Sequence, residues 1–281
     1  MRRIETLGVA AIAAAGVAAA GGSSALAQDK LQEVLDRGTL IVGTGSTNPP
    51  WHFRNDEGEL VGFDTDIARI IANGLFDDPN AVEFVTQAPD ARIPNLATDK
   101  VDISCQFMTV TAGRAQQVAF TVPYYREGVG LLLREDGDYA DYEALREAGG
   151  DVTISVLQNV YAEEMVHSAL PEAQVDQYES PNLMYQALNS GRSDAAATDA
   201  SSLAYYMAQN PGAYRDAGYF WNPQSYACAM KPGEPTWHRF VDTVLREAMV
   251  GVEFPAYADA FEHWFGVRPP APEIGFPQEF R

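Results

Sequence analysis

Short runs rich in β-branched residues alternate with helix-length amphipathic segments along most of this chain, and this alternation limits its fold more than any other feature. The strand candidates are TLIVG (39–43), VEFV (82–85), VDIS (101–104), GVGLLL (128–133), TISV (153–156), VDQY (175–178), DAAAT (194–198) and SYACAM (225–230). Strands that alternate with helices favour an α/β fold with largely parallel sheets. In such folds ligands bind at the carboxyl ends of the strands, so the residues that follow the strands are the first candidates for a site.

The segments between these strands carry helix signals at their ends. A helix capped by Asp64 is expected to place four apolar side chains on one face: Ile67, Ile70, Ile71 and Leu75. ARIPNLATD (91–99) is expected to form a shorter helix that leads into VDIS. SPNLMYQALNSG (180–191) has serine at the cap, proline in the first turn and glycine just past the end, which is the usual asymmetry of a helix. Two helices over roughly 236 to 265 are expected to close the fold.

Residues 1–27 have the order of a secretory signal peptide: Arg2 and Arg3, then an apolar run rich in alanine, then an A-x-A sequence that ends at Ala27. Cleavage there starts the mature chain at Gln28. A retained membrane anchor is the alternative, but glycines interrupt the run and it is shorter than the ~20 residues that span a bilayer. No later segment of the sequence is long and apolar enough to span one. The remaining part is large enough for one domain or for two lobes of about 100 residues or more.

The formal net charge of −20 makes nucleic acid and anionic membrane surfaces poor partners. An acidic surface also serves solubility, so it does not indicate the charge of a substrate. Cys105 and Cys228 are the two cysteines of the sequence. In a chain exported to an oxidising compartment such a pair tends to form a disulfide. Composition alone leaves two free buried thiols as the alternative.

No sequence pattern indicates a catalytic, metal or cofactor site. The four histidines are scattered and lack H-E-x-x-H spacing, which argues against a zinc site: His52, His167, His238 and His263. There is no G-x-S-x-G elbow and no G-x-x-x-x-G-K phosphate loop. GTGSTNPP (43–50) begins like a dinucleotide fingerprint, but Asn48 replaces the third glycine, and Pro49 and Pro50 prevent a long helix from starting there. We therefore expect no cofactor and interpret the stretch as a loop that presents Trp51.

Five segments, taken in order, resemble one protein family: GTLIVGTGSTNPPWHF, ELVGFDTDIARIIA, ARIPNLATDKVDISCQFMTVTAGRAQQVAFTVPYYREGVGLLLRE, SGRSDAAATDASSLAYY and SYACAMKPGEP. They are similar to the polar amino-acid-binding proteins of bacterial ABC importers, the family 3 solute-binding proteins, and are nearest in motifs to the glutamate/aspartate-type binders. The resemblance covers nearly the whole chain after residue 27. Its most specific part is the first half, where an RIP-x-L helix, a VDI strand, a T-x-T-x-x-R turn and an F-x-x-PYY segment keep the family's order and spacing.

The resemblance implies the family's architecture and location. It implies an α/β, two-lobed periplasmic binding protein fold with two hinge strands and a ligand closed between the lobes. Mapped onto this sequence, 1–27 is the signal peptide, 28–133 plus 226–281 form lobe 1, and 134–225 form lobe 2. It also implies a disulfide between Cys105 and Cys228, because glutamate and aspartate binders carry cysteines at matching places.

The turn TVTAGR (109–114) is the strongest candidate for an anion site. Thr111 is expected to cap a helix over about 112–118, so that backbone N–H groups, the helix dipole and the Arg114 guanidinium converge on one point. The resemblance implies that Arg114 and the hydroxyl of Thr109 hold the α-carboxylate of an amino acid. The alternative is a surface arginine that pairs with a neighbouring acid.

Three further residues match ligand-binding positions of the family. Asp199, at the end of DAAAT, matches an aspartate that receives the α-ammonium, with a plain helix cap as its alternative role. Trp51 matches an aromatic residue that covers the apolar stem of the ligand, and its alternative is a core tryptophan. Arg92 matches an arginine that lies near the side-chain carboxylate in acidic-amino-acid binders, and its alternative is an arginine on the helix surface.

The chain departs from the family pattern at two places. Asn159, Val160 and Tyr161 stand where the family usually has G-T-T, so a hydroxyl that helps to hold the carboxylate is missing, although the backbone N–H groups of Val160 and Tyr161 remain donors. Phe107 stands where a small residue is common, which makes the pocket smaller. Both departures leave the identity of the ligand open, including a ligand that is not a standard α-amino acid.

Three classes of function are compatible with these features. The leading one is a binding protein that captures a small polar metabolite, such as a polar amino acid, and delivers it to a membrane ABC permease without chemistry. The second is an enzyme like cyclohexadienyl dehydratase, which shares the scaffold and would need a glutamate such as Glu163 in the cleft as general acid. The third is an extracytoplasmic sensor or accessory protein.

The sequence also ranks the amino acids as ligands. A cationic side chain would be repelled by Arg92 if that residue faces the ligand, whereas an acidic or amide side chain would gain a charge-assisted hydrogen bond. We therefore expect Glu, Asp, Gln and Asn first, small neutral amino acids second, and cationic amino acids last.

Overall fold

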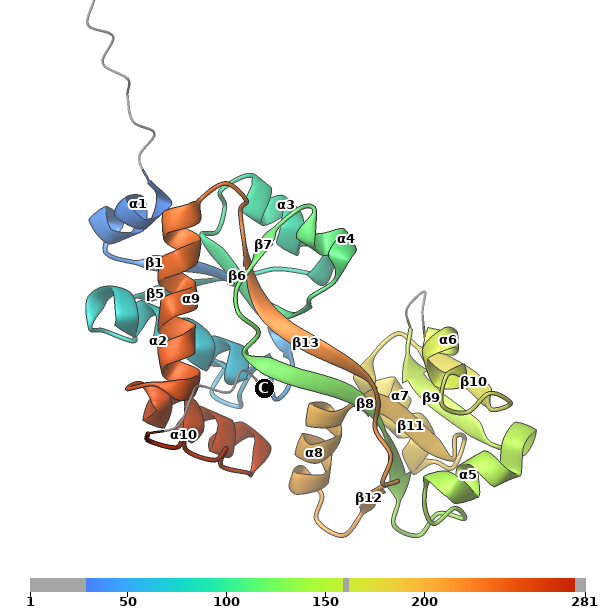
Figure 1. The fold of residues 1–281 in the computed structure, drawn as a ribbon. Helices are drawn as coiled ribbons and strands as arrows, with labels where there is room; N and C mark the ends of the chain where they lie inside the picture. The colour runs from blue at the N-terminus through green and yellow to red at the C-terminus, as the bar shows by residue number, and fades with distance from the viewer. Residues whose placement is uncertain (1–28, 159–161, 276–281) are drawn as a thin grey trace, which may run out of the picture.

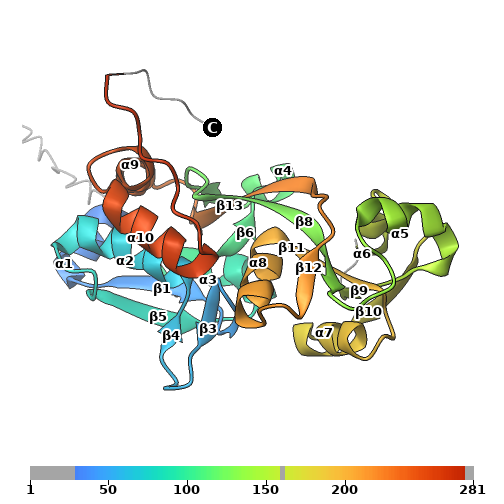
Figure 2. The same ribbon diagram turned by 90° about the horizontal axis from the view of Figure 1, so that it is seen from below.

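The computed structural model describes residues 29–158 and 162–275 (Figures 1 and 2). Within this part of the chain the strands form one sheet of ten strands and a second sheet of three. The main path of the large sheet runs through β10 (Gln174–Tyr178), β9 (Thr153–Leu157), β11 (Ala195–Asp199), β8 (Tyr125–Arg134), β13 (Trp221–Met230), β6 (Ile103–Thr109), β1 (Leu40–Thr44) and β5 (Val82–Thr86). Beside this path, β12 (Tyr214–Asp216) pairs with β8 and β7 (Ala119–Phe120) pairs with β13. The small sheet consists of β2 (Thr47–Asn48), β3 (His52–Arg54) and β4 (Leu60–Val61).

Helices cover both faces of the large sheet, which gives the α/β fold expected from the sequence. The helices are α1 (Lys30–Arg37), α2 (Phe63–Phe76), α3 (Arg92–Ala97), α4 (Ala112–Ala115), α5 (Tyr142–Ala148), α6 (Ala162–His167), α7 (Pro181–Asn189), α8 (Ala200–Gln209), α9 (Pro235–Val250) and α10 (Phe254–Phe265). Short 3-10 turns precede α3, at Pro89–Ala91, and follow α5, at Gly149–Asp151. Among the described residues no helix combines the length and the apolar character that crossing a bilayer requires.

The buried side chains fall into two groups, which define two lobes. In lobe 1, residues of β1 and β6 pack against α2 and α9, as Val42, Ile103, Ile71 and Leu245 illustrate. In lobe 2, one core joins β8, β9 and β11 to α5 and α6, and another joins the opposite face to α7 and α8. Figures 1 and 2 show β8 and β13 running between the two groups of helices, with α8 of lobe 2 lying near α10 of lobe 1.

The two long strands β8 and β13 connect the lobes. Tyr226 of β13 belongs to the lobe 1 core, whereas Trp221 at the start of the same strand packs in the lobe 2 core. The register of β13 against β8 is irregular between Trp221 and Gln224, and Asn222 in this stretch has a φ of 51°. The expected dividing positions of the lobes, after 133 and after 225, stay predictions.

The expectation of largely parallel sheets holds for only part of each lobe, because antiparallel pairs also occur inside both lobes and throughout the small sheet. The pairs β1–β5, β1–β6, β9–β10 and β9–β11 are parallel. All pairs made by β8 and β13 are antiparallel. The chain enters lobe 2 along β8 and returns along β13, so these two strands run in opposite directions.

Most predicted helix ends are confirmed. The Ser180 and Thr111 side chains cap α7 and α4, with acceptor distances of 3.4 Å from Leu183 N and 3.3 Å from Arg114 N. However, α4 ends at Ala115, before the predicted end at 118. The predicted cap at Asp64 is wrong: α2 begins at Phe63 after Gly62, and the Asp64 side chain bonds to groups outside the helix.

Cys105 and Cys228 form a disulfide, which confirms the predicted bridge. Their Cα atoms lie 4.4 Å apart on β6 and β13, and both side chains are buried in the lobe 1 core. The bridge therefore ties a strand of the first half of the chain to the strand that returns from lobe 2.

Replacing both cysteines by serine is expected to lower the free energy of unfolding by about 2–5 kcal/mol, because the bridge closes a long loop in the unfolded chain. The sequence separation of the two cysteines is 123. Urea unfolding of the oxidised protein and of the double-serine variant measures the difference. Two free thiols titrated in the unfolded, unreduced protein would contradict the bridge.

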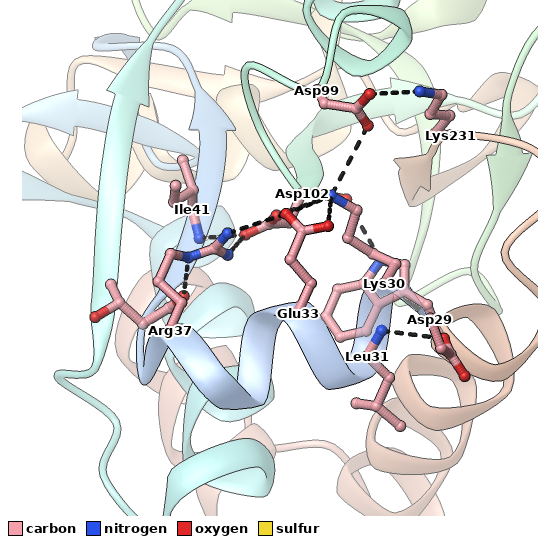
Figure 3. A network of polar contacts seen from close by, with 11 residues as sticks. Asp29, Lys30, Leu31, Glu33, Arg37, Ile41, Asp99, Asp102 and Lys231 are labelled. Atoms are coloured by element: carbon pink, nitrogen blue, oxygen red, sulfur yellow. Dashed lines mark hydrogen bonds and ion pairs between the residues drawn. The ribbon is translucent and has the colours of Figure 1, made fainter. Parts of the chain in front are cut away.

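A buried carboxylate anchors helix α1 to the start of β6 (Figure 3). Asp102 is 5% exposed, and it accepts hydrogen bonds from the Arg37 guanidinium and, at 2.8 Å, from the backbone N–H of Ile41. The buried Lys30 ammonium lies 3.8 Å from Asp102. Burial raises the pKa of Asp102, while the Ile41 N–H and these two cations oppose the shift. The network extends through Asp99 to Lys231 after β13.

Replacing Asp102 by Ala is expected to lower the free energy of unfolding by about 3 kcal/mol, because Lys30, Arg37 and the Ile41 N–H lose a buried partner. Chemical denaturation of the purified variant measures this loss. Glu143→Ala is the matched control, since its ion pair with Arg146 is exposed and its removal is expected to leave stability unchanged. Equal losses in the two variants would contradict the assignment.

Candidate functional site

Seven side chains from four strands share one face of the large sheet where the lobes meet. We call them the hinge face: Phe107 and Thr109 of β6, Tyr125 and Glu127 of β8, Asp199 of β11, and Gln224 and Tyr226 of β13. Alternate residues of a strand point to the same face. The register places Tyr226 opposite Thr109 on one side and opposite Tyr125 on the other. Gln224 is opposite Glu127, and Asp199 is opposite Val129, two positions along β8.

Contacts between these side chains confirm that they share a face. The Thr109 hydroxyl donates to Gln224 Oε1 at 3.0 Å. The Tyr226 ring lies 5.7 Å from that of Phe107 and 6.4 Å from that of Tyr125. The hinge face therefore joins lobe 1 to lobe 2 without interruption.

Arg114 lies at the lobe 1 end of the hinge face. Its side chain is half-buried, and its Nη1 donates to the carbonyl of Thr109 at 2.8 Å. Among the described residues no carboxylate pairs with this guanidinium, so the alternative of a surface arginine paired with an acid has no support. The Thr111 cap places the N-terminus of α4 beside it.

Arg92 is a second cation of lobe 1. It is 9% exposed, so it is not an arginine on the helix surface. Its guanidinium donates to the carbonyls of Pro89, at 2.7 Å, and Gln106, at 2.9 Å. Burial and the charge of Arg114 lower the pKa of Arg92 to about 10, still far above neutrality. Two guanidinium groups thus lie near each other in lobe 1, and within residues 29–158 and 162–275 neither forms an ion pair with an acid.

Two carboxylates lie on the lobe 2 side of the hinge face. Asp199 at the end of β11 is half-buried and receives a hydrogen bond from the Tyr226 hydroxyl. Asp199 precedes α8 at its cap position, but its side chain makes no capping bond, so the helix-cap alternative is not supported. Glu127 is 2% exposed and accepts from the N–H of Gly128 at 2.9 Å and of Ser201 at 3.3 Å, and from the Ser201 hydroxyl.

Burial raises the pKa of both acids, and the charge of Asp199 raises that of Glu127 further. Hydrogen bonds from Ser201 and Gly128 oppose the shift at Glu127, and the bond from Tyr226 opposes it at Asp199. Among the described residues neither carboxylate bonds to a lysine, arginine or histidine. The two lobes therefore present uncompensated charges of opposite sign.

Asp64 fixes the end of β6 that carries Phe107. Its carboxylate is 0% exposed and accepts from His52 Nδ1 at 2.7 Å, from the Tyr124 hydroxyl at 2.5 Å and from the Phe107 N–H at 2.9 Å. Phe107 has a φ of 31°, an uncommon value for a residue with a side chain. Its ring stacks on that of His52 at 4.7 Å. Asp64, in the first turn of α2, thus holds the strained backbone of Phe107 in place. Thr109 and Arg114 follow Phe107 along the chain.

Trp51 is 1% exposed and packs among aromatic rings of the lobe 1 core. Its indole lies 4.8 Å from the ring of Tyr125 and 5.2 Å from that of Tyr226. Its Nε1 donates to the Ser201 hydroxyl of α8 at 3.0 Å, so Trp51 joins the lobes. Contact of Trp51 with a ligand stays a prediction.

Three further residues were singled out from the sequence: Val160, Tyr161 and Glu163. Val160 and Tyr161 lie outside the described residues. Glu163 is exposed in the first turn of α6. No group of three or more histidine, cysteine, aspartate or glutamate side chains in the described parts of the chain is arranged to hold a metal ion.

Sequence reasoning missed Glu127, Ser201 and Tyr226. The signal for Glu127 was present, because this glutamate comes directly before the apolar strand candidate GVGLLL (128–133). Ser201 and Tyr226 carried no such signal, since serine after a strand and tyrosine within one are common without a role in a site.

Residues 40–267 match the family model of bacterial extracellular solute-binding proteins, family 3. The chain belongs to this family. Among its relatives, the ABC transporter glutamine-binding protein GlnH of Bacillus subtilis (strain 168) is 26% identical over 247 residues, which cover 87% of this chain and 89% of that protein. The glutamate/aspartate import solute-binding protein of Escherichia coli (strain K12) is 22% identical over 271 residues, covering 94% and 89%.

Solved structures show the same fold. An ancestral cationic amino acid solute-binding protein superposes with a TM-score of 0.72 at 30% identity and covers 84% of this chain and 99% of that chain. An ancestral amino acid-binding protein described as a precursor of cyclohexadienyl dehydratase has a TM-score of 0.68 at 30% identity, with coverage of 84% and 99%. The family and the two-lobed periplasmic binding protein fold predicted from the sequence are confirmed.

The raised pKa values of the acidic pair determine how stability changes with pH. The folded pair holds protons at higher pH than the unfolded chain does, so the free energy of unfolding falls as the pH rises from the ordinary carboxyl range to neutrality. Asp199→Asn removes one of the two charges and is expected to reduce this fall in the free energy of unfolding. Each tenfold decrease in the proton affinity of the folded site reduces the fall by about 1.4 kcal/mol. Urea unfolding at about pH 5 and about pH 8 measures the fall.

Asp56→Asn, at an exposed position in the hairpin between β3 and β4, is the control and should keep the pH dependence of the parent. If Asp199→Asn also keeps it, the pair does not titrate as the burial of these groups requires.

Proposed function

We propose that this protein captures a polar amino acid between its lobes and delivers it to a membrane ABC permease. The observation that carries the proposal is the distribution of charge: among the described residues, Arg92 and Arg114 in lobe 1 form no ion pair with an acid, and Glu127 and Asp199 in lobe 2 form none with a base. A zwitterion supplies the missing partner to each side. Membership of the solute-binding family and the names of the relatives support the same class of ligand.

The proposed roles follow the positions of the groups. Arg114 grips the α-carboxylate, with the hydroxyl of Thr109 beside it. Asp199 receives the α-ammonium. Each end of the ligand is held by a different lobe, so the ligand binds the closed form more tightly and shifts the protein toward it. The lobe boundaries after 133 and after 225 remain part of this proposal.

Trp51 and Phe107 form the apolar side of the proposed site, where a rigid aromatic surface suits the stem of an amino acid. Arg92 favours an acidic or amide side chain, so the expected order remains Glu, Asp, Gln and Asn, then small neutral amino acids, then cationic ones. The relatives named for glutamine and for glutamate/aspartate support this order, whereas the ancestral cationic amino acid protein supports the reverse.

The proposed activity is binding without chemistry, at a periplasmic location. The signal-peptide order of residues 1–27 and the description of the family as extracellular support that location. The alternative function is an enzyme like cyclohexadienyl dehydratase, which is suggested by the name of one similar structure. Its candidate acid, Glu163, is exposed in the first turn of α6 and is not one of the side chains of the hinge face. Turnover of a cyclohexadienyl substrate by the purified protein would favour the enzyme.

A sensor or accessory protein is the third possibility. It would bind the same ligand but would report it to another membrane partner. Permease and ATPase genes beside the gene for this chain would favour transport over sensing.

Arg114→Ala is expected to weaken amino-acid binding by about 2–5 kcal/mol, because a desolvated carboxylate loses its charged partner. Calorimetry with each of the twenty amino acids on the parent identifies the ligand, and the tightest binder is then titrated into the variant. Arg146→Ala removes an exposed arginine of α5 and is expected to bind like the parent.

Small-angle scattering provides the second readout, since the parent should become more compact when the ligand is added and the variant should not at the same concentration. An Arg114→Ala variant that binds within twofold of the parent would show that this guanidinium does not hold the ligand.

A further inference from the structure

Glu127 and Asp199 form a pair of acids that the assignment of one α-ammonium to Asp199 does not account for. They lie on one face of adjacent strands, because Asp199 is opposite Val129 and Glu127 is two positions from Val129 on β8. The charge of Asp199 acts directly on Glu127. A single cationic group between the lobes can therefore reach both carboxylates.

The groups around the pair are neutral or acidic. Two phenols face it, those of Tyr125 of β8 and Tyr226 of β13, and the charge of Asp199 also acts on the phenol of Tyr185 of α7. Burial and the neighbouring carboxylates raise the pKa of each phenol, so all three are uncharged at neutral pH. The next acid, Asp64, acts on Tyr226 from lobe 1.

The cations of neighbouring elements do not neutralise the pair. Helix α8, which packs against β8, carries no charged side chain. Arg215 of β12 is bound at the opposite end of β8, where it donates to the carbonyls of Glu135, Tyr139 and Ala140. Arg126 of β8 is exposed and belongs to the other face of the strand. A buried and a half-buried carboxylate on one face, without a cation among the described neighbours, disfavour the doubly charged state and favour uptake of a proton by the pair.

Glu127 is fixed in place. Both of its oxygens accept from Ser201, one from the N–H and one from the hydroxyl, and Oε1 also accepts from Gly128. The Ser201 hydroxyl is in turn held by Trp51 Nε1 from lobe 1. The carboxylate is thus pre-organised at the hinge and does not swing into solvent.

We propose that Glu127 is a second carboxylate of the ammonium subsite, and that the cationic group of the ligand replaces a proton that Glu127 and Asp199 share in the ligand-free protein. The proton leaves to solvent as the ammonium enters, so that the charge of the buried site stays balanced. This inference rests on the proposed function and extends it, since it makes capture depend on pH and requires an ammonium group on the ligand.

The test is calorimetry in two buffers of different ionisation enthalpy, phosphate and Tris. The probe is the tightest binder among the twenty amino acids. The parent is expected to release about one proton per ligand near neutral pH, and its Kd is expected to rise up to about tenfold for each pH unit below that. Glu127→Gln, which keeps the size of the side chain, should release almost no proton and should bind more weakly above neutral pH.

Controls separate this role from a structural one. Glu143→Gln changes an exposed acid of α5 and is expected to keep the proton release of the parent. Glu127→Asp restores the charge and should restore the pH dependence, which a purely structural role of Glu127 would not produce. Thermal unfolding of Glu127→Gln verifies that the variant is folded.

The outcomes also separate this inference from the proposed function. Absence of binding by all twenty amino acids would overturn the proposed function. Binding by the parent without proton release, or unchanged release in Glu127→Gln, would overturn the role of Glu127 alone.

Discussion

The antiparallel pairing of β8 with β13 is the constraint on which the rest of the structure depends. It is the link through which the sheet of lobe 1 continues into that of lobe 2, and it places Tyr125, Glu127, Gln224 and Tyr226 side by side. Because alternate residues share a face, one register decides which polar groups of the two lobes meet. A shift of one residue in β13 would turn Gln224 and Tyr226 away from the face that carries Glu127 and Asp199.

The site combines buried charge with missing partners, which is unusual for a protein interior. An isolated buried charge destabilises a protein, so structural acids are usually paired. Two cations and an N–H group surround the carboxylate of Asp102 in this way. No charged partner of opposite sign pairs in this way, among the described residues, with Arg92, Arg114, Glu127 or Asp199. Under the proposed function, a ligand supplies the missing partners of these charged groups. Hydrogen bonds to carbonyls and hydroxyls hold the side chains in place in its absence.

Much of the fold was predictable from local signals, because alternating strands and helices, the Ser180 and Thr111 caps and the paired cysteines each leave a pattern in the sequence. The antiparallel centre was not predictable from local pattern, since the directions of β8 and β13 depend on how the chain returns from lobe 2. In the site, Arg114, Arg92 and Asp199 were found from motifs that lie next to strand ends. Glu127 and Ser201 were missed, because their meeting depends on contacts between segments 74 residues apart. The Asp64 cap was misjudged, because three tertiary donors compete for that carboxylate.

The disulfide joins two segments of lobe 1 between which the whole of lobe 2 is inserted. Lobe 2 is made from one continuous stretch, whereas β13, α9 and α10 of lobe 1 come last in the chain. Cys105 therefore has no native partner until lobe 2 has been made and exported. It follows that every strand of lobe 2, together with the start of β13, precedes Cys228 in the chain, so the bridge can form only after the whole segment that makes lobe 2 is present.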